Sequence, residues 1–563
     1  MTGAGGLLLL GLLSALLLGG AVRPGTGFWA AGDPKVIASA LLDRMSDEQV
    51  LGQVFMLAYP GDTPPELMFR WIRERGLGGV KIFGWNAESS DKAAAAIAEL
   101  QKAALASPGG IPLLVATDEE GGWIRHVKGD TSFTPGNMAI GASGRPYDAY
   151  RSGLFIGREL AALGVNMNFA PVVDLATRPR SEIIGPRAFC VNPMEAAVLG
   201  SAFAKGLGDA GVIATAKHFP GHGDTDLDSH LALPVIRIDE KTLWNRELVP
   251  YRMLVGEGIP AIMSGHLCFP LVSGSTDPAS LSRFFLTDLL RKRLGFKGLV
   301  VTDDLFMGGA APTLPDGVAR WTVSDACLKA MEAGDDMLMM SRLLDFDDPA
   351  WTKLLAAYRA NPEFRARVRE AATIVLLTKL RYLKSWGPEA LVPDLATLHA
   401  RVPAPGAAEY FRHEAFRSAT ALDPSRLPFR PAGRILVAGP FPEFAQAALA
   451  VYPGARSFGF SFFPESAARP AELAAFDRAA AGCDTVLICV ANQAGMDFAE
   501  RAHLEGKKVG IISVQSPAPL ERVPWASAAV AVYGFSPESL KAGLAVLTGA
   551  EPSEGRMPIL FHR

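Results

Sequence analysis

The stretch that decides the fold is PMEAAVLGSAFAKGLGDAGVIATAK, residues 193–217. Its first part, Pro193–Gly208, has the pattern of an amphipathic helix, and its last part, Val212–Lys217, is the short apolar run of a buried strand. Strands that are apolar along their whole length are typical of parallel sheets, which helices cover on both faces. This stretch therefore predicts one helix and one strand of an α/β fold.

The same alternation extends from about residue 36 to residue 385. The predicted strands are Val54–Ala58, Gly79–Phe83, Pro112–Thr117, Asn166–Ala170, Val212–Lys217, Ala261–Ser264, Leu299–Thr302 and Met337–Met340. The predicted helices include Ser90–Ala106, Pro193–Gly208, Glu240–Glu257 and Thr287–Leu294. Eight strands that alternate with helices fit a (β/α)8 barrel, although a doubly wound sheet would show the same alternation.

A second domain is expected, because 563 residues exceed what one ordinary core contains. Residues 386–433 are rich in Pro and Ala without clear periodicity, which indicates a linker. Residues 434–563 contain further apolar runs, namely Ile435–Ala438, Thr485–Val490, Val509–Val514 and Ala528–Tyr533. They predict a smaller, sandwich-like α/β domain built on an open parallel sheet.

Composition and charge exclude several classes of protein. Hydrophobic residues make up 49% of the chain and charged residues 20%, which is a globular composition. The formal net charge is -3 without a clustered basic excess, so we expect no nucleic-acid partner. The 5 cysteines contain no CxxC pair, which argues against a zinc ribbon or a disulfide framework and favours small buried core residues.

The N-terminal residues predict an exported protein. From Gly5 to Val22 every residue is apolar or small, and Arg23 is the first charged residue. Residues 1–30 are therefore expected to be a cleaved secretory signal or an uncleaved membrane anchor, and a misassigned start is a third alternative. We expect the protein in the periplasm, the envelope or the medium, with membrane association if the segment is retained.

Charged residues gather where the predicted strands end. They are Asp118, Asp174, Lys217, His218, His266, Asp303 and Asp304. In a barrel, the carboxyl ends of the strands form the face that carries the chemistry. Each buried charge is costly unless it is paired or used, so several at successive strand ends indicate an active site.

The densest polar stretch is KHFPGHGDTDLDSH, residues 217–230. His218 and His222 have a spacing that can bind zinc on a helix, but the intervening proline and glycine break a helix, so no metal site is expected. A polar loop with hydrogen-bonded histidines is a structural alternative. The interpretation we favour is an acid/base loop in which Asp228 lies beside His230, fixes its tautomer and raises its basicity.

This loop resembles the corresponding loop of the β-N-acetylhexosaminidases of glycoside hydrolase family 3. Five further motifs resemble the same family in the same order. They are Asp118–Gly122 (DEEGG), Asn166–Asp174 (NMNFAPVVD), Ile184–Phe189 (IGPRAF), Leu294–Met307 with its paired aspartates, and Glu554–Ile559 (EGRMPI). The resemblance covers nearly all of residues 40–340 and, more loosely, the C-terminal part.

The resemblance implies a barrel followed by an α/β sandwich, and a retaining glycosidase that uses no metal or other cofactor. It implies a carbohydrate substrate, with release of terminal β-linked N-acetylglucosamine from cell-wall muropeptide or chitin fragments. Asp303 matches the nucleophile of the family, and Asp228 and His230 match its acid/base dyad. The positions that match sugar-binding residues are Asp118, Arg187, Lys217 and His218.

Three residues depart from the family pattern. Glu119 stands where glutamine is common, Trp123 stands where an arginine is usual, and Cys190 replaces the glycine that usually follows the Arg-x-Phe sequence. These departures bear on substrate specificity and leave the dyad and the nucleophile in place.

Three alternative functions are weighed against this one. A β-glucosidase-like member of the family would take its acid from a glutamate of the second domain and would lack the Asp-x-His loop. A β-N-acetylglucosaminide phosphorylase would use phosphate in place of water, because a neutral histidine does not repel an anion. A non-catalytic wall-binding protein on a retained barrel would be expected to lose Asp303 or His230, and both are present.

Overall fold

The computed structural model describes residues 27–178, 180–181, 183–311 and 321–561. Its first domain is built on an eight-stranded sheet in the order β10-β1-β2-β3-β6-β7-β8-β9. Every neighbouring pair in this sheet is parallel. A parallel bridge between Val301 and Met337 joins β9 to the chain just before β10, so the sheet closes on itself. The predicted barrel is therefore confirmed, and the doubly wound alternative is wrong for this domain.

All eight predicted barrel strands are present, and no end shifts by more than two residues. They are β1 (Phe55–Leu57), β2 (Gly79–Ile82), β3 (Leu114–Thr117), β6 (Met167–Asn168), β7 (Ile213–Phe219), β8 (Ala261–Ser264), β9 (Leu299–Thr302) and β10 (Leu338–Met340). Apolar side chains fill the barrel, and they include Met56, Phe169, Ile213, Met263 and Met339. A short antiparallel hairpin, β4 (Glu119–Gly121) with β5 (Ile124–Arg125), follows β3 at the carboxyl end of the barrel.

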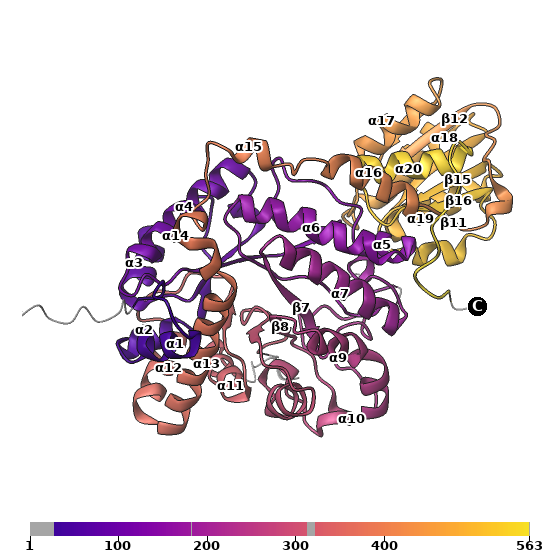
Figure 1. The fold of residues 1–563 in the computed structure, drawn as a ribbon. Helices are drawn as coiled ribbons and strands as arrows, with labels where there is room; N and C mark the ends of the chain where they lie inside the picture. The colour runs from indigo at the N-terminus through magenta and orange to yellow at the C-terminus, as the bar shows by residue number, and fades with distance from the viewer. Residues whose placement is uncertain (1–26, 179, 182, 312–320, 562–563) are drawn as a thin grey trace, which may run out of the picture.

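Helices surround this sheet (Figure 1). They are α1 (Pro34–Leu42), α2 (Asp47–Gly52), α3 (Glu66–Arg75), α4 (Ser90–Ala106), α5 (Asn137–Ser143), α6 (Pro146–Ala162), α7 (Pro193–Asp209), α8 (Glu240–Thr242), α9 (Leu248–Gly256), α10 (Pro270–Ser273), α11 (Val323–Ala333), α12 (Pro349–Ala360) and α13 (Pro362–Tyr382). The predicted helix Glu240–Glu257 is divided, because a π-helical segment, Leu243–Glu247, separates α8 from α9. The predicted helix Thr287–Leu294 lies mostly within a longer π-helical segment, Phe284–Arg293.

The sequence sets both ends of α7, the helix of the deciding stretch. The side chain of Asn192 accepts hydrogen bonds from the backbone N–H groups of Met194 and Glu195, and Pro193 occupies the first turn, where its missing N–H costs nothing. After the helix, Gly211 adopts a φ of 85°, which is the left-handed region that suits glycine, and β7 follows directly.

The second domain is built on a six-stranded sheet in the order β11-β16-β15-β14-β12-β13. Its strands are β11 (Thr420–Ala421), β12 (Ile435–Gly439), β13 (Arg456–Gly459), β14 (Thr485–Val490), β15 (Lys508–Ser513) and β16 (Ala528–Ala531). All pairs are parallel except β11 with β16. Helices α18 (Arg469–Ala480) and α19 (Gln493–Leu504) pack on one face, while α17 (Pro442–Val451) and α20 (Pro537–Thr548) pack on the other. This arrangement matches the predicted α/β sandwich.

The range predicted as a linker, residues 386–433, contains regular structure. Helices α14 (Gly387–Ala390), α15 (Leu398–Arg401) and α16 (Ala407–Ser418) lie in it, and so does β11, which pairs with β16. The second sheet therefore begins before residue 434. The pattern was misleading because α16 carries a mixture of charged and aromatic residues, and β11 has only two residues, which is too short for a recognisable pattern.

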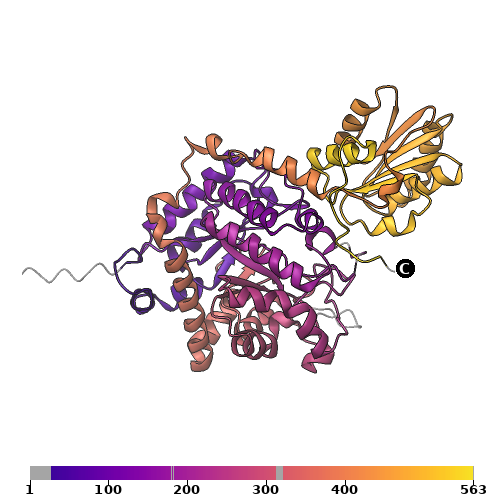
Figure 2. The same cartoon turned by 45° about the vertical axis from the view of Figure 1, so that its right-hand side comes forward.

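The two domains share one apolar cluster and lie side by side in both views (Figures 1 and 2). Met138 and Ala139 of α5, together with Ile184 and Ala188 of the barrel, pack in the same cluster as Phe498 of α19. The EGRMPI motif returns the chain to the barrel, where the N–H of Arg556 donates to the carbonyl of Ala142. Arg556 also forms an ion pair with Glu195 of α7. The interface is thus apolar and reinforced by the closing motif.

Two sequence predictions concern other parts of the chain. All 5 cysteines are buried and free of disulfides, as expected for core residues. The predicted signal or anchor, residues 1–30, lies outside the described residues up to residue 26. Within the described ranges, we find no helix that is long and apolar enough to cross a membrane.

Candidate active site

A cavity of about 240 Å³ opens at the carboxyl end of the barrel. Six of the seven predicted site residues line it, namely Asp118, Arg187, Lys217, His218, His230 and Asp303. The seventh, Asp228, lies behind His230 and contacts its ring. Residues that the sequence distributes over almost 200 positions are thus brought to one place by the ends of successive strands.

Asp118 follows β3 and lies between two lysines. Its carboxylate contacts the Nζ of Lys81 from β2 at 2.7 Å and accepts a hydrogen bond from Lys217 of β7. Burial alone would raise the pKa of Asp118, but the charges of Lys217 and Lys81 outweigh it and hold the pKa well below its usual value. Asp118 is therefore ionised at neutral pH.

Glu120 links Lys217 to Arg187. Its Oε1 lies 2.6 Å from the Nζ of Lys217, and its two oxygens accept hydrogen bonds of 2.8 Å each from the guanidinium of Arg187. Burial would raise the pKa of Glu120, yet the charges of Arg187 and Lys217 lower it below its usual value. A bidentate pair of this kind fixes the direction of both side chains.

His218 continues this chain of contacts to Asp174. Its Nε2 lies 3.3 Å from Nη2 of Arg187, and its Nδ1 lies 2.6 Å from Oδ2 of Asp174. Burial would raise the pKa of Asp174, but His218 and the backbone N–H of His222 lower it to about 2. Asp174 therefore holds the imidazole of His218 in a fixed orientation at the wall of the cavity.

Asp303 and Asp304 follow β9 but differ in their contacts. The Oδ1 of Asp304 accepts hydrogen bonds from the backbone N–H groups of Phe306 and Ser341, so this carboxylate stabilises a turn. Both aspartates line the cavity, and Asp303 accepts a hydrogen bond from the N–H of Asp304. Burial would raise the pKa of Asp303, but the imidazoles of His218, His266 and His230 lower it below its usual value. Asp303 is thus an ionised carboxylate directed at the cavity.

Asp228 and His230 form the predicted pair. The Oδ1 of Asp228 lies 2.7 Å from the Nδ1 of His230 and also accepts the backbone N–H of that residue at 2.8 Å. A carboxylate at this nitrogen favours the tautomer with a proton on Nδ1, which leaves Nε2 available for proton transfer. The side chain of His230 is 59% exposed, the highest value for the predicted site residues, so its Nε2 can exchange protons with water.

The loop that carries this pair is attached to the segment after Asp303. The N–H groups of Gly308 and Gly309 donate to the carbonyls of His230 and Ser229, each at 3.0 Å. The hydroxyl of Ser229 also lies 3.0 Å from Nε2 of His222. These contacts set the position of His230 relative to Asp303.

The zinc interpretation gains no support from the geometry. His218 lies at the end of β7 and contacts Asp174 and Arg187, whereas His222 faces Ser229. Among the described residues, no group of three or more His, Cys, Asp or Glu side chains could hold a metal ion.

Two residues of the site were missed at the sequence level. Lys81 is a charged residue in the middle of an apolar predicted strand, and its side chain is completely buried, so its position was a usable signal. The DEEGG motif does not by itself assign a role to Glu120. Neighbouring residues of a strand face opposite sides, so only one of Glu119 and Glu120 can face the cavity, and the sequence alone does not say which.

The structure shows the surroundings of the three residues that depart from the family pattern. Glu119 is buried, and its Oε2 accepts the N–H of Val127; burial raises its pKa well above the usual value, so it is neutral like the glutamine it replaces. Trp123 packs against Phe462 and Phe535 of the second domain. Cys190 is buried, and burial raises the pKa of its thiol to about 11.

We expect Glu119→Gln to fold as stably as the unchanged protein below about pH 4 and to be the more stable of the two at higher pH. A neutral buried glutamate makes the native protein lose stability as the pH rises from about 4.3, the pKa in the unfolded chain, towards its raised folded pKa. Glutamine does not titrate, so this loss disappears. Thermal unfolding of both proteins between about pH 5 and pH 8 measures the difference.

Glu120→Gln is the matched control on the same hairpin. It removes the counter-charge of Lys217 and Arg187, which should destabilise the protein by about 3–5 kcal/mol, as the loss of one partner of a buried ion pair does. If Glu119→Gln lowers the melting temperature at pH 7 as much as Glu120→Gln does, Glu119 is ionised and this account of the departure is wrong.

Known proteins resemble both the first domain and the whole chain. The model of the Glycosyl hydrolase family 3 N terminal domain matches residues 48–361. The chain is 34% identical over 336 residues to Beta-hexosaminidase A of Pseudoalteromonas piscicida, covering 54% of this chain and 55% of that protein. It is 33% identical over 348 residues to a protein of Cellulomonas fimi named Beta-N-acetylglucosaminidase/beta-glucosidase, covering 60% of this chain and 58% of that one. The chain therefore spans a little over half the length of these two curated relatives.

A solved structure extends the likeness to the second domain. A glycoside hydrolase family 3 beta-N-acetylglucosaminidase from Paenibacillus sp. str. FPU-7 superimposes with a TM-score of 0.81 at 28% identity, covering 92% of this chain and 99% of that one. The relatives and this structural neighbour are all glycosidases by name. Because the family model matches more than half of the 563 residues, the chain belongs to glycosyl hydrolase family 3.

Proposed function

We propose that the protein is a retaining glycosidase that releases terminal β-linked N-acetylglucosamine. The observation that carries this proposal is the Asp228–His230 pair, which the structure holds at the same cavity as the ionised, cavity-lining Asp303. A retaining glycosidase needs one nucleophile and one group that first gives and then takes a proton. The names of the Cellulomonas fimi relative and of the structural neighbour support N-acetylglucosamine as the sugar.

In the first step, a carboxylate oxygen of Asp303 attacks the anomeric carbon and forms a covalent glycosyl-aspartate. The bond from that carbon to the glycosidic oxygen breaks, and the oxygen takes the proton from Nε2 of His230. Asp228, at 2.7 Å from Nδ1, stabilises the imidazolium before this transfer.

In the second step, Nε2 of His230 takes a proton from water, and the water oxygen attacks the anomeric carbon from the face that the leaving group vacated. The ester bond to Asp303 breaks, and the carboxylate is restored. Two successive inversions at one carbon give net retention. The usual rule that relates carboxylate separation to stereochemistry does not apply, because one member of the pair is a histidine.

Asp118, Arg187, Lys217 and His218 are proposed to bind the sugar. Their charges are already balanced within the protein, so they can hydrogen-bond hydroxyl groups without leaving a charge unpaired when the substrate departs. Their fixed directions, set by Glu120 and Asp174, mean that little ordering is needed when the sugar binds.

The direct test of the proposed function is a comparison of p-nitrophenyl β-glycosides of N-acetylglucosamine and of glucose, each with and without phosphate. We expect hydrolysis of the first at least about a hundredfold faster than of the second, because a site that hydrogen-bonds a polar substituent discriminates against the analogue that lacks it. We expect no sugar phosphate among the products. Equal rates would favour the β-glucosidase alternative. Formation of a sugar 1-phosphate would favour the phosphorylase.

Asp303→Ala should lower kcat by at least about three orders of magnitude while the protein still folds, because the nucleophile is removed. Asp304→Ala is the matched control at the adjacent residue. It loses the turn contacts to Phe306 and Ser341, so its main effect should be a lower melting temperature. If Asp304→Ala is inactive and Asp303→Ala keeps its activity, the nucleophile is assigned to the wrong aspartate.

His230→Ala should slow substrates with a poor leaving group strongly, because the glycosidic oxygen then leaves without a proton. An activated aryl glycoside should still form the glycosyl-enzyme, which then accumulates because no base activates water. Azide needs no base, so it should restore turnover and give the β-glycosyl azide. Asp228→Ala should show a milder form of the same defect, since it keeps the imidazole and removes only its partner.

Product analysis by mass spectrometry and rates with and without azide test this assignment. If His230→Ala slows activated and unactivated substrates to the same degree, and azide has no effect, the acid is another residue. That result would leave Asp303 in place and would move the protein out of the hexosaminidase branch of its family.

A further inference from the structure

His126 lines the active-site cavity, and the proposed mechanism gives it no role. The β4–β5 hairpin brings this residue back to Asp118, since the N–H of His126 donates to the carbonyl of Asp118 at 3.1 Å. Neighbouring side chains of a strand face opposite sides, and Arg125 contacts the hydroxyl of Thr131 at 2.9 Å, outside the cavity lining. The hairpin therefore places the side chain of His126 beside Asp118 at the cavity.

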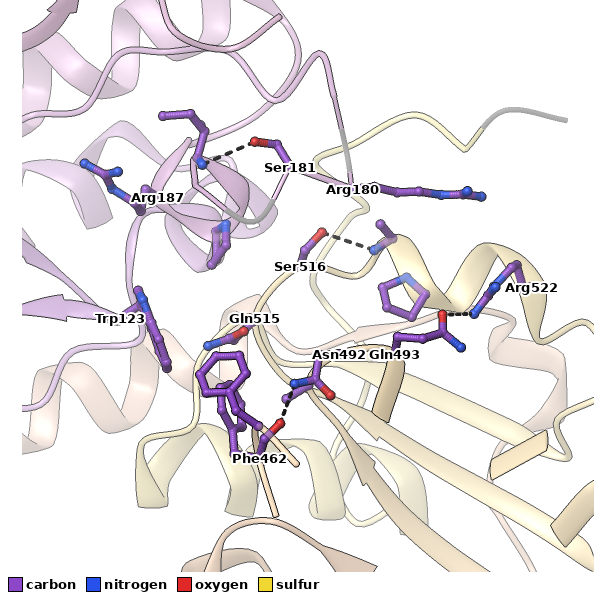
Figure 3. A pocket seen from close by; sticks show the side chains of 16 residues that line it. Trp123, Arg180, Ser181, Arg187, Phe462, Asn492, Gln493, Gln515, Ser516 and Arg522 are labelled. Atoms are coloured by element: carbon purple, nitrogen blue, oxygen red, sulfur yellow. Dashed lines mark hydrogen bonds between the residues drawn. The ribbon is translucent and has the colours of Figure 1, made fainter. Parts of the chain in front are cut away.

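The side of the cavity on which His126 lies is not the side that leads to the second domain. Trp123 and Arg187 line the active-site cavity and also a second cavity, of about 260 Å³, between the two domains. Figure 3 shows that the side chains of this second cavity come from both domains and face one another. Among the described residues, Phe83 and His126 line the first cavity and not the second. His126 is thus placed to contact the group that occupies the active-site cavity itself.

The buried side chain of Lys81 sets the orientation of the imidazole. Its Nζ contacts Oδ2 of Asp118 at 2.7 Å, the carbonyl of Ile82 at 3.0 Å and Nδ1 of His126 at 3.4 Å. An ammonium group has three donors and no acceptor, so Nδ1 of His126 is the acceptor in this contact. The distance from the same Nδ1 to Oδ2 of Asp118 is 3.7 Å, which is too long for a hydrogen bond. The proton of the neutral imidazole therefore lies on Nε2.

The imidazole of His126 is neutral and packed in place. Burial and the charge of Lys81 lower the pKa of His126 to about 4. The ring of Phe83 lies against it with a centroid distance of 5.4 Å and stacks on Trp85 at 4.4 Å. The indole N–H of Trp85 donates to the carbonyl of Tyr59 at 3.0 Å, which fixes this aromatic pair to the end of β1. The direction of the imidazole is thus set before any sugar binds, so little ordering is needed on binding.

Nε2 is the polar atom that His126 offers to the cavity. Its side chain is 27% exposed, and Nδ1 is turned towards the completely buried Lys81. Among the described residues, Nε2 has no hydrogen-bond partner, and it does not belong to the polar atoms that are buried without one. An N–H group in this position is free to donate to a group in the cavity.

We infer that His126 is a further sugar-binding residue, and that its Nε2–H donates to the hydroxyl group whose own proton Asp118 accepts. A hydroxyl group both donates and accepts, an ionised carboxylate only accepts, and the Nε2–H only donates, so the two side chains match one hydroxyl from both directions. A sugar without this hydroxyl leaves both side chains without a partner, which disfavours its binding. This inference rests on the proposed glycosidase activity and adds a residue to the recognition of the sugar.

The experiment uses p-nitrophenyl β-N-acetylglucosaminide, its 3-, 4- and 6-deoxy analogues, and two variants of His126. Asparagine carries its amide on Cγ, near the place of Nδ1, so His126→Asn keeps a partner for Lys81 and loses the donor in the cavity. Glutamine carries its amide one atom further, near the place of Nε2, so His126→Gln keeps that donor.

We expect His126→Asn to lower kcat/KM for the parent glycoside about tenfold, and His126→Gln to lower it less than about threefold, as the loss and the retention of one hydrogen bond predict. His413→Asn changes a half-exposed histidine on α16, outside the cavity, and should leave kcat/KM unchanged.

The deoxy analogues identify the contact. In His126→Asn, the ratio of kcat/KM for the parent to that for the analogue should fall about tenfold for one analogue, because that analogue already lacks the hydroxyl which His126 contacts. The ratio should stay unchanged for the other two. Each ratio compares two substrates on one preparation, so a partial loss of folded protein cancels.

Three results would overturn the inference. An unchanged ratio for all three analogues would mean that His126 contacts none of these hydroxyls. An equal loss in His126→Asn and His126→Gln would mean that the donor at Nε2 is not what matters. A limb missing from the pH profile of kcat/KM in His126→Gln would mean that His126 transfers a proton. If the unchanged protein does not hydrolyse the parent glycoside, the proposed function itself fails, which is a different result from an active protein in which His126→Asn loses nothing.

Discussion

The site depends on one chain of alternating charges at the mouth of the barrel. Lys81, Asp118, Lys217, Glu120 and Arg187 contact one another in that order, and the side chains of Lys81, Lys217 and Glu120 are almost completely buried. A buried charge is costly unless a partner neutralises it, so no member can move without exposing another to an unfavourable environment. These ion pairs thereby hold β2, β7 and the hairpin after β3 in the one arrangement that shapes the cavity.

Arg187 connects this chain of charges to the second domain. The residues beside it, Ile184 and Ala188, belong to the apolar cluster that also contains Phe498 of α19. The direction of its guanidinium is set by Glu120 on one side, and the position of its backbone is set by the domain interface on the other. Moving the second domain would therefore disturb the mouth of the barrel, which is one physical reason for a barrel enzyme to keep a second domain packed beside its active site.

The sequence predicted the barrel well because buried parallel strands are apolar along their whole length, and all eight were found. The sequence was a poor guide where a strand is too short to show an apolar pattern, and where the position of a side chain depends on a contact far away in the chain. The two-residue strand β11 was placed in a linker, since its only support is its pairing with β16. The orientation of Glu120 depends on Lys217, 97 positions further along the chain, and no local pattern reports such a contact.

The site divides its two kinds of chemistry between two environments. Asp303 is only partly exposed at the end of a strand, where three imidazoles lower the pKa of its carboxyl group. His230 lies on a loop and is 59% exposed, which suits its proposed role of giving a proton in one step and regaining its basic form before the next. A buried histidine in its place would face the desolvation that lowers the pKa of His222 to about 4, too low to supply a proton at neutral pH. An exposed loop with its own carboxylate partner therefore avoids the desolvation that would lower the pKa of a histidine inside the barrel.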